Sequence, residues 1–210
     1  MTDTTTNKPD RRRGKGRGNS ERSAEMRGEL IAAGRRLFAQ KGFADTSTPE
    51  IVAAAGVTRG ALYHHFADKT ALFAAVLEAE SRAVAQEIEA GSAEAPSARE
   101  ALLSGARAYF AAMRAPGRCR ILLVDGPAAL GPGEASRLDA LHAGRTLREG
   151  LAEALGQGDL RPLPLDALTG VLSAAFDRAA LDIASGAEEA GFLAVFAALI
   201  DGLLSPASAR

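Results

Sequence analysis

A short segment around residue 60 carries side chains that suit contact with DNA. In a helix over this segment, Leu62 and Phe66 would face inward. The residues left on its outer surface are Thr58, Arg59, Gly60, Tyr63 and His64. A helix with glycine at its start is slim enough to enter the major groove, and its N-terminus directs a partial positive charge toward phosphate. The segment therefore predicts a DNA-contacting helix.

The residues around this segment predict the elements that hold it in place. Thr48 is a candidate N-cap, and Pro49 follows it at the first position of a two-turn helix. Gly56 ends that helix and can adopt the positive φ that a tight turn between helices requires. Thr58 caps the next short helix, and Asp68 caps a long one over residues 69–90. The pattern is a helix-turn-helix over residues 46–66.

The helix-turn-helix segment resembles that of a known family. The run IVAAAGVTRGALYHHF at residues 51–66, followed by ADKTALF at 67–73, is similar to the DNA-binding signature of TetR-type transcriptional regulators. The match extends over residues 26–77. The resemblance implies a sequence-specific regulator, usually a repressor, that a small-molecule effector releases from a palindromic operator.

The resemblance also implies roles for single residues. Thr58, Arg59 and Gly60 match positions near the bases, and Arg59 is the candidate for a bidentate contact to guanine, with a phosphate contact as the alternative. The remaining candidates lie nearer the backbone or the groove edge: Thr46, Thr48, Tyr63, His64 and Lys69. Thr48 is explained equally well as a cap, Tyr63 as a packed surface aromatic, and Lys69 as a solvated lysine.

Other classes of site find little support in the sequence. His64 and His65 are adjacent on a helix and point about 100° apart, so they do not readily share a metal ion. Cys119 is the only cysteine, and we interpret it as an inert small hydrophobe, with a redox sensor as the alternative. No nucleophile elbow, phosphate-binding loop or metal-ligand spacing occurs. We expect no catalytic residue, no cofactor and no metal.

Charge is distributed unevenly along the chain. Residues 1–70 hold 13 Lys and Arg against 8 Asp and Glu, whereas the remainder of the chain is acidic. This asymmetry places a polyanionic partner such as double-stranded DNA at the N-terminal end. Residues 1–22 are basic and poor in apolar side chains, so we expect a disordered tail that either lies along DNA or stays unengaged.

The apolar periodicity predicts an all-α protein of nine helices with two domains. Residues 23–67 would form a three-helix DNA-binding domain whose first helix starts at Ser23, and residues 68–210 a larger helical domain for effector binding and dimerisation. Further helices are expected over 97–114, 118–130, 134–155, 165–185 and 188–204, with a loop at 131–133. A single cysteine and the absence of an apolar signal or membrane span favour the cytoplasm.

The last predicted helix is apolar nearly all round, over residues 192–200. Such a helix must be buried on more than one face. We interpret it, with the preceding helix, as a four-helix interface between two copies of the chain; a central position within the monomer is the alternative. A two-fold homodimer also suits a palindromic operator.

The resemblance places an effector pocket among the helices of the second domain. The candidate apolar lining residues are Tyr109, Met113, Leu122, Leu123 and Phe176. The candidate polar contacts are Arg120, Asp125, His142 and Arg178. Ordinary core packing is the alternative for each lining residue. A nucleoid-type DNA binder without an effector is the alternative for the whole protein.

Overall fold

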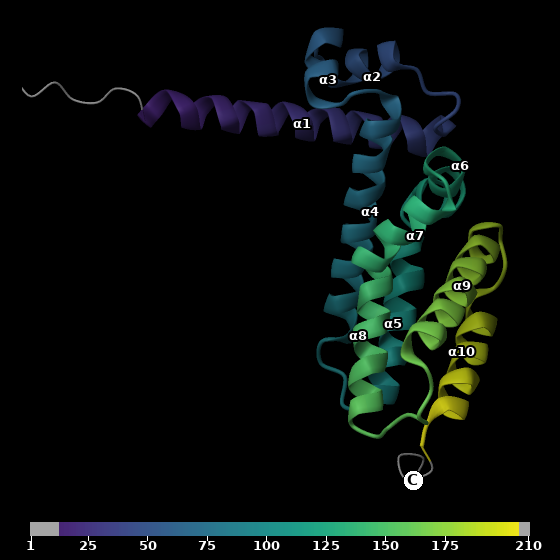
Figure 1. Ribbon diagram of the computed structural model, residues 1–210. Coiled ribbons are helices and arrows are strands. Elements are labelled where there is room, and N and C mark those ends of the chain that lie inside the picture. The colour runs from purple at the N-terminus through teal and green to yellow at the C-terminus, as the bar shows by residue number, and fades with distance from the viewer. Residues whose placement is uncertain (1–12, 206–210) are drawn as a thin grey trace, which may run out of the picture.

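Helix α4 joins two helical units in the computed structural model, which describes residues 13–205 (Figure 1). The first unit contains α1 (Arg13–Lys41), α2 (Thr48–Ala55) and α3 (Arg59–His65), packed on the start of α4 (Lys69–Ser92). The second contains the rest of α4 and the elements that follow it. These are α5 (Ala98–Met113), η1 (Arg120–Asp125), α6 (Gly126–Leu130), α7 (Pro132–Leu141), α8 (Ala143–Gly156), α9 (Leu165–Ala184) and α10 (Glu189–Leu203).

The core of the N-terminal unit explains how a seven-residue helix is held in place. Ile51 of α2 and Leu62 of α3 are buried beside Phe38 of α1 and Phe73 of α4. The rings of Phe38 and Phe73 meet edge to face with their centroids 5.0 Å apart, an arrangement that aromatic pairs favour. Helix α3 is too short to be stable alone, so this burial fixes its direction.

The second unit has its own core, built from the inward faces of α4, α5, α8, α9 and α10. Phe110, Phe176 and Phe196 meet at its centre, and the rings of the last two are stacked 4.0 Å apart. Helix α10 packs against α5 at the edge of the bundle, and Val195 and Leu199 remain exposed on it (Figure 1). The predicted all-α fold is confirmed, with one isolated β-bridge between Leu160 and Leu204 among the described residues.

Several predicted boundaries need correction. Helix α1 begins at Arg13, not at Ser23, so residues 13–22 are helical where we expected disorder; residues 1–12 lie outside the described residues. The segment 118–130 is divided into η1, a π-helical stretch, and α6. Only Gly131, with φ of 84°, interrupts the chain at the predicted loop 131–133, because Pro132 already occupies the first turn of α7.

The predicted helix over residues 134–155 is two helices that meet at His142. The amide of His142 donates to the carbonyl of Asp139 at 2.9 Å instead of continuing the α-helical pattern. Gly144 permits this sharp bend, because a Cβ atom there would lie 2.6 Å from the Asp139 carboxylate. The described residues therefore form ten α-helices and one π-helical segment, not nine helices. No helix in this part of the chain combines the length and apolarity needed to span a bilayer.

Candidate nucleic-acid interface and internal cavity

The turn between α2 and α3 has the geometry that the sequence predicted. Gly56 adopts φ of 66° and ψ of 26°, a left-handed conformation that favours glycine. The amide of Val57 then donates to the carbonyl of Val52 at 3.0 Å and closes the turn. The hydroxyl of Thr58 accepts from the amide of Ala61 at 3.2 Å, so Thr58 is the N-cap of α3.

The two faces of α3 differ as predicted. Leu62 is buried, whereas Thr58, Arg59, Gly60 and His64 are exposed. The side chain of Tyr63 is 43% exposed. A Cβ atom added at Gly60 would meet only the Thr58 hydroxyl, at 3.9 Å, so the first turn of α3 is bare. A flat surface such as the floor of a DNA groove can therefore approach the backbone closely.

Arg59 and Tyr63 form a pair along the exposed face of α3. The guanidinium carbon lies 5.4 Å from the centre of the Tyr63 ring, within the range of a cation–π contact. A long hydrogen bond of 3.5 Å also joins Arg59 Nη2 to Tyr63 Oη. This hydrogen bond, together with the charge of Arg59, lowers the pKa of Tyr63. The contact holds the side chain of Arg59 along the exposed face of α3.

Two of the predicted DNA-contacting residues have other roles in this structure. Thr46 is buried, and its hydroxyl donates to the carbonyl of Gly42 at 2.7 Å. The ammonium of Lys69 donates to the carbonyls of Phe43 at 2.8 Å and Thr46 at 2.9 Å, and it lies over the Phe43 ring. Both residues therefore close the loop between α1 and α2 instead of facing solvent.

The cap of α2 also differs from the prediction. Ser47, not Thr48, is the N-cap, and Glu50 accepts hydrogen bonds from its amide at 2.9 Å and from its hydroxyl at 2.8 Å. A hydrogen bond from Lys41, followed by those from Ser47, lowers the pKa of Glu50 to about 2. Thr48 lies one residue inside the helix and contributes a hydrogen bond to the Tyr63 hydroxyl.

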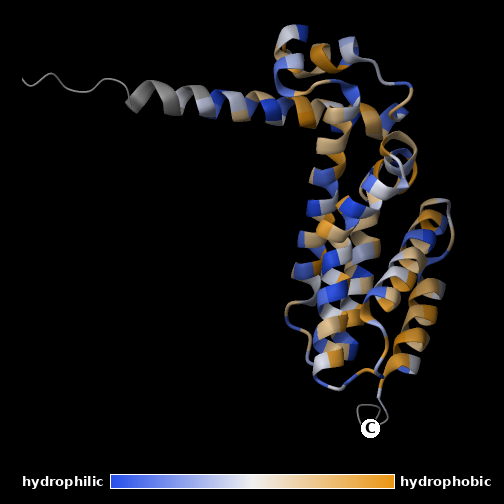
Figure 2. Cartoon of the chain, in the orientation of Figure 1, coloured by the Kyte–Doolittle hydropathy of each residue, from blue (hydrophilic) through white to orange (hydrophobic). Residues whose placement is uncertain are grey.

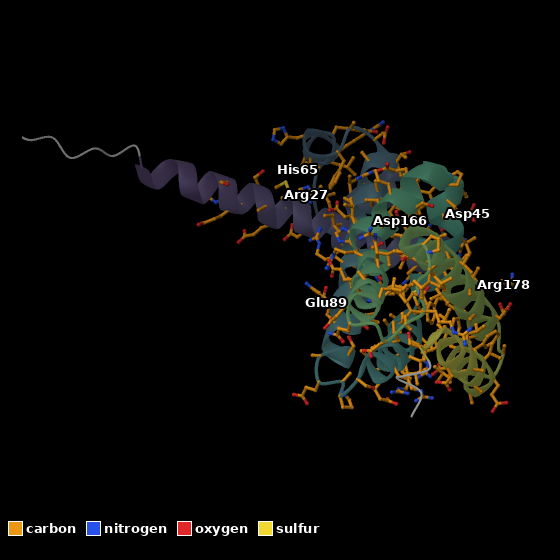
Figure 3. All side chains as sticks on the ribbon, turned by 60° about the horizontal axis from the view of Figure 1, so that its bottom comes forward. Arg27, Asp45, His65, Glu89, Asp166 and Arg178 are labelled. Carbon is orange, nitrogen blue, oxygen red and sulfur yellow. The ribbon has the colours of Figure 1, made fainter. Side chains whose placement is uncertain are left out.

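The second unit contains two adjoining cavities, both partly open to solvent, of about 370 and 580 Å³. Tyr109 lines both, Phe176 lines the smaller, and Met113, Leu122 and Leu123 line the larger. The five apolar predictions therefore fall on cavity walls. Arg178 does not, because it lies on the outside of α9, points away from the bundle and pairs with Asp182 (Figure 3). Arg120, Asp125 and His142 also lie outside the walls of both cavities.

Sequence reasoning missed two acidic residues in the shared wall of these cavities. Asp139 of α7 and Asp177 of α9 line both spaces, and Tyr109 Oη donates to Asp177 Oδ1 at 2.8 Å. Burial, followed by the nearby charge of Asp177, raises the pKa of Asp139 to about 6. Burial also raises the pKa of Asp177, and that of Tyr109 rises for the same reason. Asp177 follows Phe176 directly, which is the only signal that could have indicated it.

An Asp139→Asn variant is expected to be more stable than the wild type at pH 7.5, by up to about 3 kcal/mol. Because the folded-state pKa of Asp139 is raised to about 6 from 3.8, ionisation destabilises the fold as the pH rises through this window. The gain should therefore be full above pH 6 and vanish near pH 4. Urea unfolding across this range measures it, with the exposed Asp166→Asn as control. A variant less stable than the wild type at pH 7.5 would refute the assignment.

The π-helical segment η1 connects the larger cavity to the N-terminal unit. Leu122 and Leu123 line the cavity, while residues at the two ends of the same segment contact the loop between α1 and α2. Asp125 Oδ2 accepts from the amide of Phe43 at 2.9 Å, and Arg120 Nη2 donates to the carbonyl of Lys41 at 3.0 Å. Segment η1 therefore lies between the larger cavity and the chain segment that leads into α2.

Comparison with known proteins gives matches in both units. A family described as "Bacterial regulatory proteins, tetR family" matches residues 30–76, and one described as "Tetracyclin repressor-like, C-terminal domain" matches residues 99–206. The HTH-type transcriptional regulator AcrR of Shigella flexneri is 47% identical over 58 residues, which are 28% of this chain and 27% of that protein. TtgR of Pseudomonas putida is 43% identical over 58 residues, 28% of each chain. These alignments span about a quarter of the relatives' lengths.

Similarity over the whole fold comes from solved structures. A crystal structure of a TetR-family transcriptional regulator from Pectobacterium atrosepticum is similar with a TM-score of 0.69 and 32% sequence identity. That alignment covers 88% of this chain and 96% of the other. The similarity therefore includes the cavity-bearing unit as well as the helix-turn-helix.

Proposed function

Since the chain belongs to the TetR family of bacterial regulatory proteins, we propose that it is a transcriptional repressor controlled by a small molecule. It binds a palindromic operator in double-stranded DNA as a homodimer, and an effector in the second unit releases it. The observation that carries the proposal is the outer face of α3, where Arg59 and its neighbours are exposed on a helix held rigidly from behind.

Different residues of the helix-turn-helix have different tasks in this proposal. Thr58, Arg59 and Gly60 reach base edges from the first turn of α3, while Tyr63 and His64 lie along the backbone or groove edge. Thr48 joins the second group through its contact with Tyr63. Thr46 and Lys69 act indirectly, because their hydrogen bonds fix the loop that positions α2.

The homodimer of the proposal forms through α9 and α10. Exposed apolar side chains lie on both helices, namely Val171 on α9 and Val195 and Leu199 on α10. Val195 and Leu199 are one helical turn apart, so they form a continuous apolar strip that the monomer leaves uncovered. The position of α10 at the edge of the bundle favours this interface over burial inside the monomer (Figure 2). A second copy related by a two-fold axis would cover the strip.

A Leu199→Glu variant is expected to be monomeric at micromolar concentration, whereas the wild type is a dimer. The side chain of Leu199 is 46% exposed in the monomer and would be covered in the dimer, where an unpaired charge is costly. Leu141→Glu is the matched control, since Leu141 is 52% exposed on α7, away from this surface. Analytical ultracentrifugation distinguishes the species. A Leu199→Glu protein that remains dimeric would rule out this interface.

The effector acts through η1 in this proposal. A ligand that extends from the wall shared by the two cavities into the larger one would press on Leu122 or Leu123, and the hydrogen bonds of Arg120 and Asp125 would carry the shift to the loop before α2. For the ligand to release the operator, the two conformations must differ in both ligand affinity and operator affinity, because a ligand shifts an equilibrium only by its differential affinity for the two states.

Selection of bound duplexes from a random-sequence pool tests the proposed function. We expect the selected DNA to contain one inverted repeat whose half-site centres are about 34–36 Å, or a multiple of that distance, apart. Footprinting on the selected site should show one protected region. Diffuse protection, without a common sequence, would instead indicate a nucleoid-type binder.

A further inference from the structure

We propose that the effector is an amphipathic organic cation, a protonated amine on an apolar body, whose charge lies against Asp139 and Asp177. The inference rests on the proposed function, in that it names the chemical class of the molecule that the cavities would hold. Both aspartates lie in the wall that the two cavities share, so one charged group placed there would be within reach of both.

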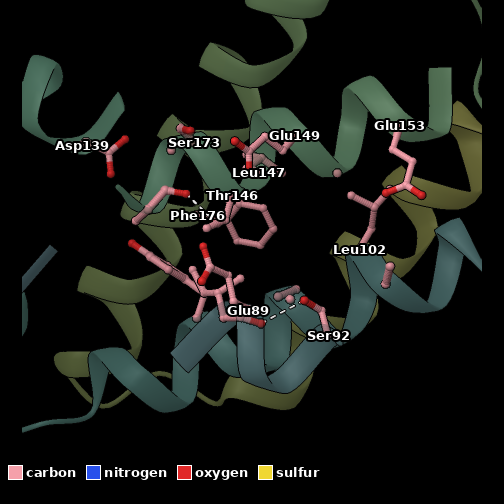
Figure 4. A pocket seen from close by; sticks show the side chains of 18 of the residues that line it. Glu89, Ser92, Leu102, Asp139, Thr146, Leu147, Glu149, Glu153, Ser173 and Phe176 are labelled. Carbon is pink, nitrogen blue, oxygen red and sulfur yellow. Dashed lines mark hydrogen bonds between the residues drawn. The ribbon is translucent and has the colours of Figure 1, made fainter. Parts of the chain in front are cut away.

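The smaller cavity is lined by acidic side chains and by no basic ones. Five carboxylates line it, and no lysine, arginine or histidine does; the five are Glu89, Asp139, Glu149, Glu153 and Asp177. Figure 4 shows the first four of these around the cavity, with the ring of Phe176 in its middle. An anionic effector would meet repulsion here, and a neutral one would leave the buried charge unpaired.

The two aspartates differ from Glu89 and Glu149 of this cavity in having no cationic partner among the described side chains; Glu153 likewise has none there and accepts a hydrogen bond from Gln157 at 3.1 Å. Glu89 and Glu149 both pair with Arg145, each at 2.7 Å. Asp139 and Asp177, in contrast, form no ion pair with any side chain that the structure describes. Asp177 accepts from Tyr109, and Asp139 accepts from the amide of Gly144. A carboxylate that is partly buried and lacks a counter-charge favours a ligand that brings one.

Apolar walls and an aromatic ring complete the recognition of such a ligand. Ile88, Leu102, Leu147 and Phe176 line the smaller cavity from four different helices. Its volume of about 370 Å³ falls in the range of sites for small organic molecules. The rings of Tyr109 and Phe176 have centroids 5.7 Å apart, and aromatic faces attract organic cations. The body of the ligand therefore has an apolar lining and its charge an acidic one.

The adjoining cavity also offers a polar group to a ligand. Ser81 of α4 is only 4% exposed and lines the larger cavity. Within the part of the chain that the structure describes, the fully buried side-chain atom without a hydrogen-bond partner is His142 Nε2, so the Ser81 hydroxyl carries no such cost. It is a polar group in the cavity wall to which a bound molecule could form a hydrogen bond. Ser173 lines both the larger and the smaller cavity and offers a second hydroxyl there.

Three probes with one carbon skeleton test the inference on the full-length protein. They are 4-phenylbutylamine, 4-phenylbutan-1-ol and 4-phenylbutanoate, which are cationic, neutral and anionic at pH 7.5. Isothermal titration calorimetry is expected to rank the amine first, about tenfold or more tighter than the alcohol, with the carboxylate weakest.

Matched variants show whether the two aspartates cause that ranking. Asp177→Asn and Asp139→Asn should each reduce the advantage of the amine over the alcohol by about tenfold. Asp182→Asn, also on α9 but outside both cavities, should leave it unchanged. Circular dichroism confirms that each variant is folded, and the alcohol reports on cavity integrity apart from charge.

Several results of these binding measurements would contradict the inference. Equal or better binding of the alcohol or the carboxylate, or no binding of the amine at about 10 mM, would overturn the inference. So would an amine preference that survives in both Asn variants. Operator affinity is measured separately without any probe, so a failure of DNA binding would refute the proposed function alone. Amine binding that leaves the operator complex intact would keep the cation site but remove its role as effector site.

Discussion

An Arg59→Ala protein is expected to bind the operator at least about 30-fold more weakly than the wild type at the same salt concentration. Loss of a bidentate arginine–guanine contact costs roughly 1–3 kcal/mol. A dimer contains two copies of α3, so the total is roughly 2–6 kcal/mol, or about 30-fold to more than 10⁴-fold. Arg59 is exposed, and within the described part of the chain its side chain contacts only Tyr63, so the fold should be unaffected.

Fluorescence anisotropy with the selected duplex measures this effect, and the salt dependence of binding identifies its origin. If Arg59 reads a base, the variant should relax specificity at one position of each half-site. If it contacts phosphate, binding should weaken uniformly across sequences and the salt slope should fall by about one unit per contact. Arg82→Ala is the control, since Arg82 is an exposed arginine on α4 that pairs with Glu78. Unchanged affinity of a folded Arg59→Ala protein would remove α3 from the interface.

An Arg118→Met variant is expected to lose about 3–5 kcal/mol of unfolding free energy. Arg118 is 7% exposed, and its guanidinium contacts Glu80 at 3.0 Å, Glu87 at 3.0 Å and the carbonyl of Ala112 at 2.6 Å. Arg35 of α1 reaches the same Glu80 carboxylate at 3.2 Å. Removing Arg118 leaves Glu80 largely buried with one partner, and that partner belongs to the other unit.

The pH dependence of stability provides an independent check of this ion network. Burial alone would raise the pKa of Glu80, but hydrogen bonds from Arg35 and Arg118 outweigh it and lower the pKa. Because the folded-state pKa is lowered, the stabilisation is present above the ordinary pKa of glutamate and is lost as the pH falls through the folded value. Urea unfolding should therefore show a smaller difference between variant and wild type in acid. A loss below about 1 kcal/mol at neutral pH would mean that the network contributes little.

Local patterns made the helix-turn-helix predictable from the sequence. Gly56 supplies a left-handed turn, and Thr58 and Asp68 supply caps, because each of these devices acts within a few residues. The same reasoning failed for Lys69, whose acceptors lie 23 to 26 positions earlier in the chain. It also failed at Thr46, which resembles a surface threonine until the loop before α2 folds over it.

The cavity was predictable only in its apolar part. Tyr109, Met113, Leu122, Leu123 and Phe176 follow a helical periodicity that predicts inward-facing side chains, and inward-facing residues are those that line a cavity. The prediction that Arg178 contacts a ligand is wrong, because helical periodicity does not distinguish a charged residue that faces a pocket from one that pairs along its own helix. Asp139 was missed because its burial depends on the bend at His142. No proline or other helix-ending residue at position 142 predicts this bend.

A structure of the protein bound to its selected duplex tests the central claim most directly. We predict two copies related by a two-fold axis, with α3 of each copy in the major groove and the Arg59 guanidinium within hydrogen-bond distance of a base edge or a phosphate. A complex in which α3 lies away from the DNA, or in which another surface of the chain occupies the groove, would contradict the account.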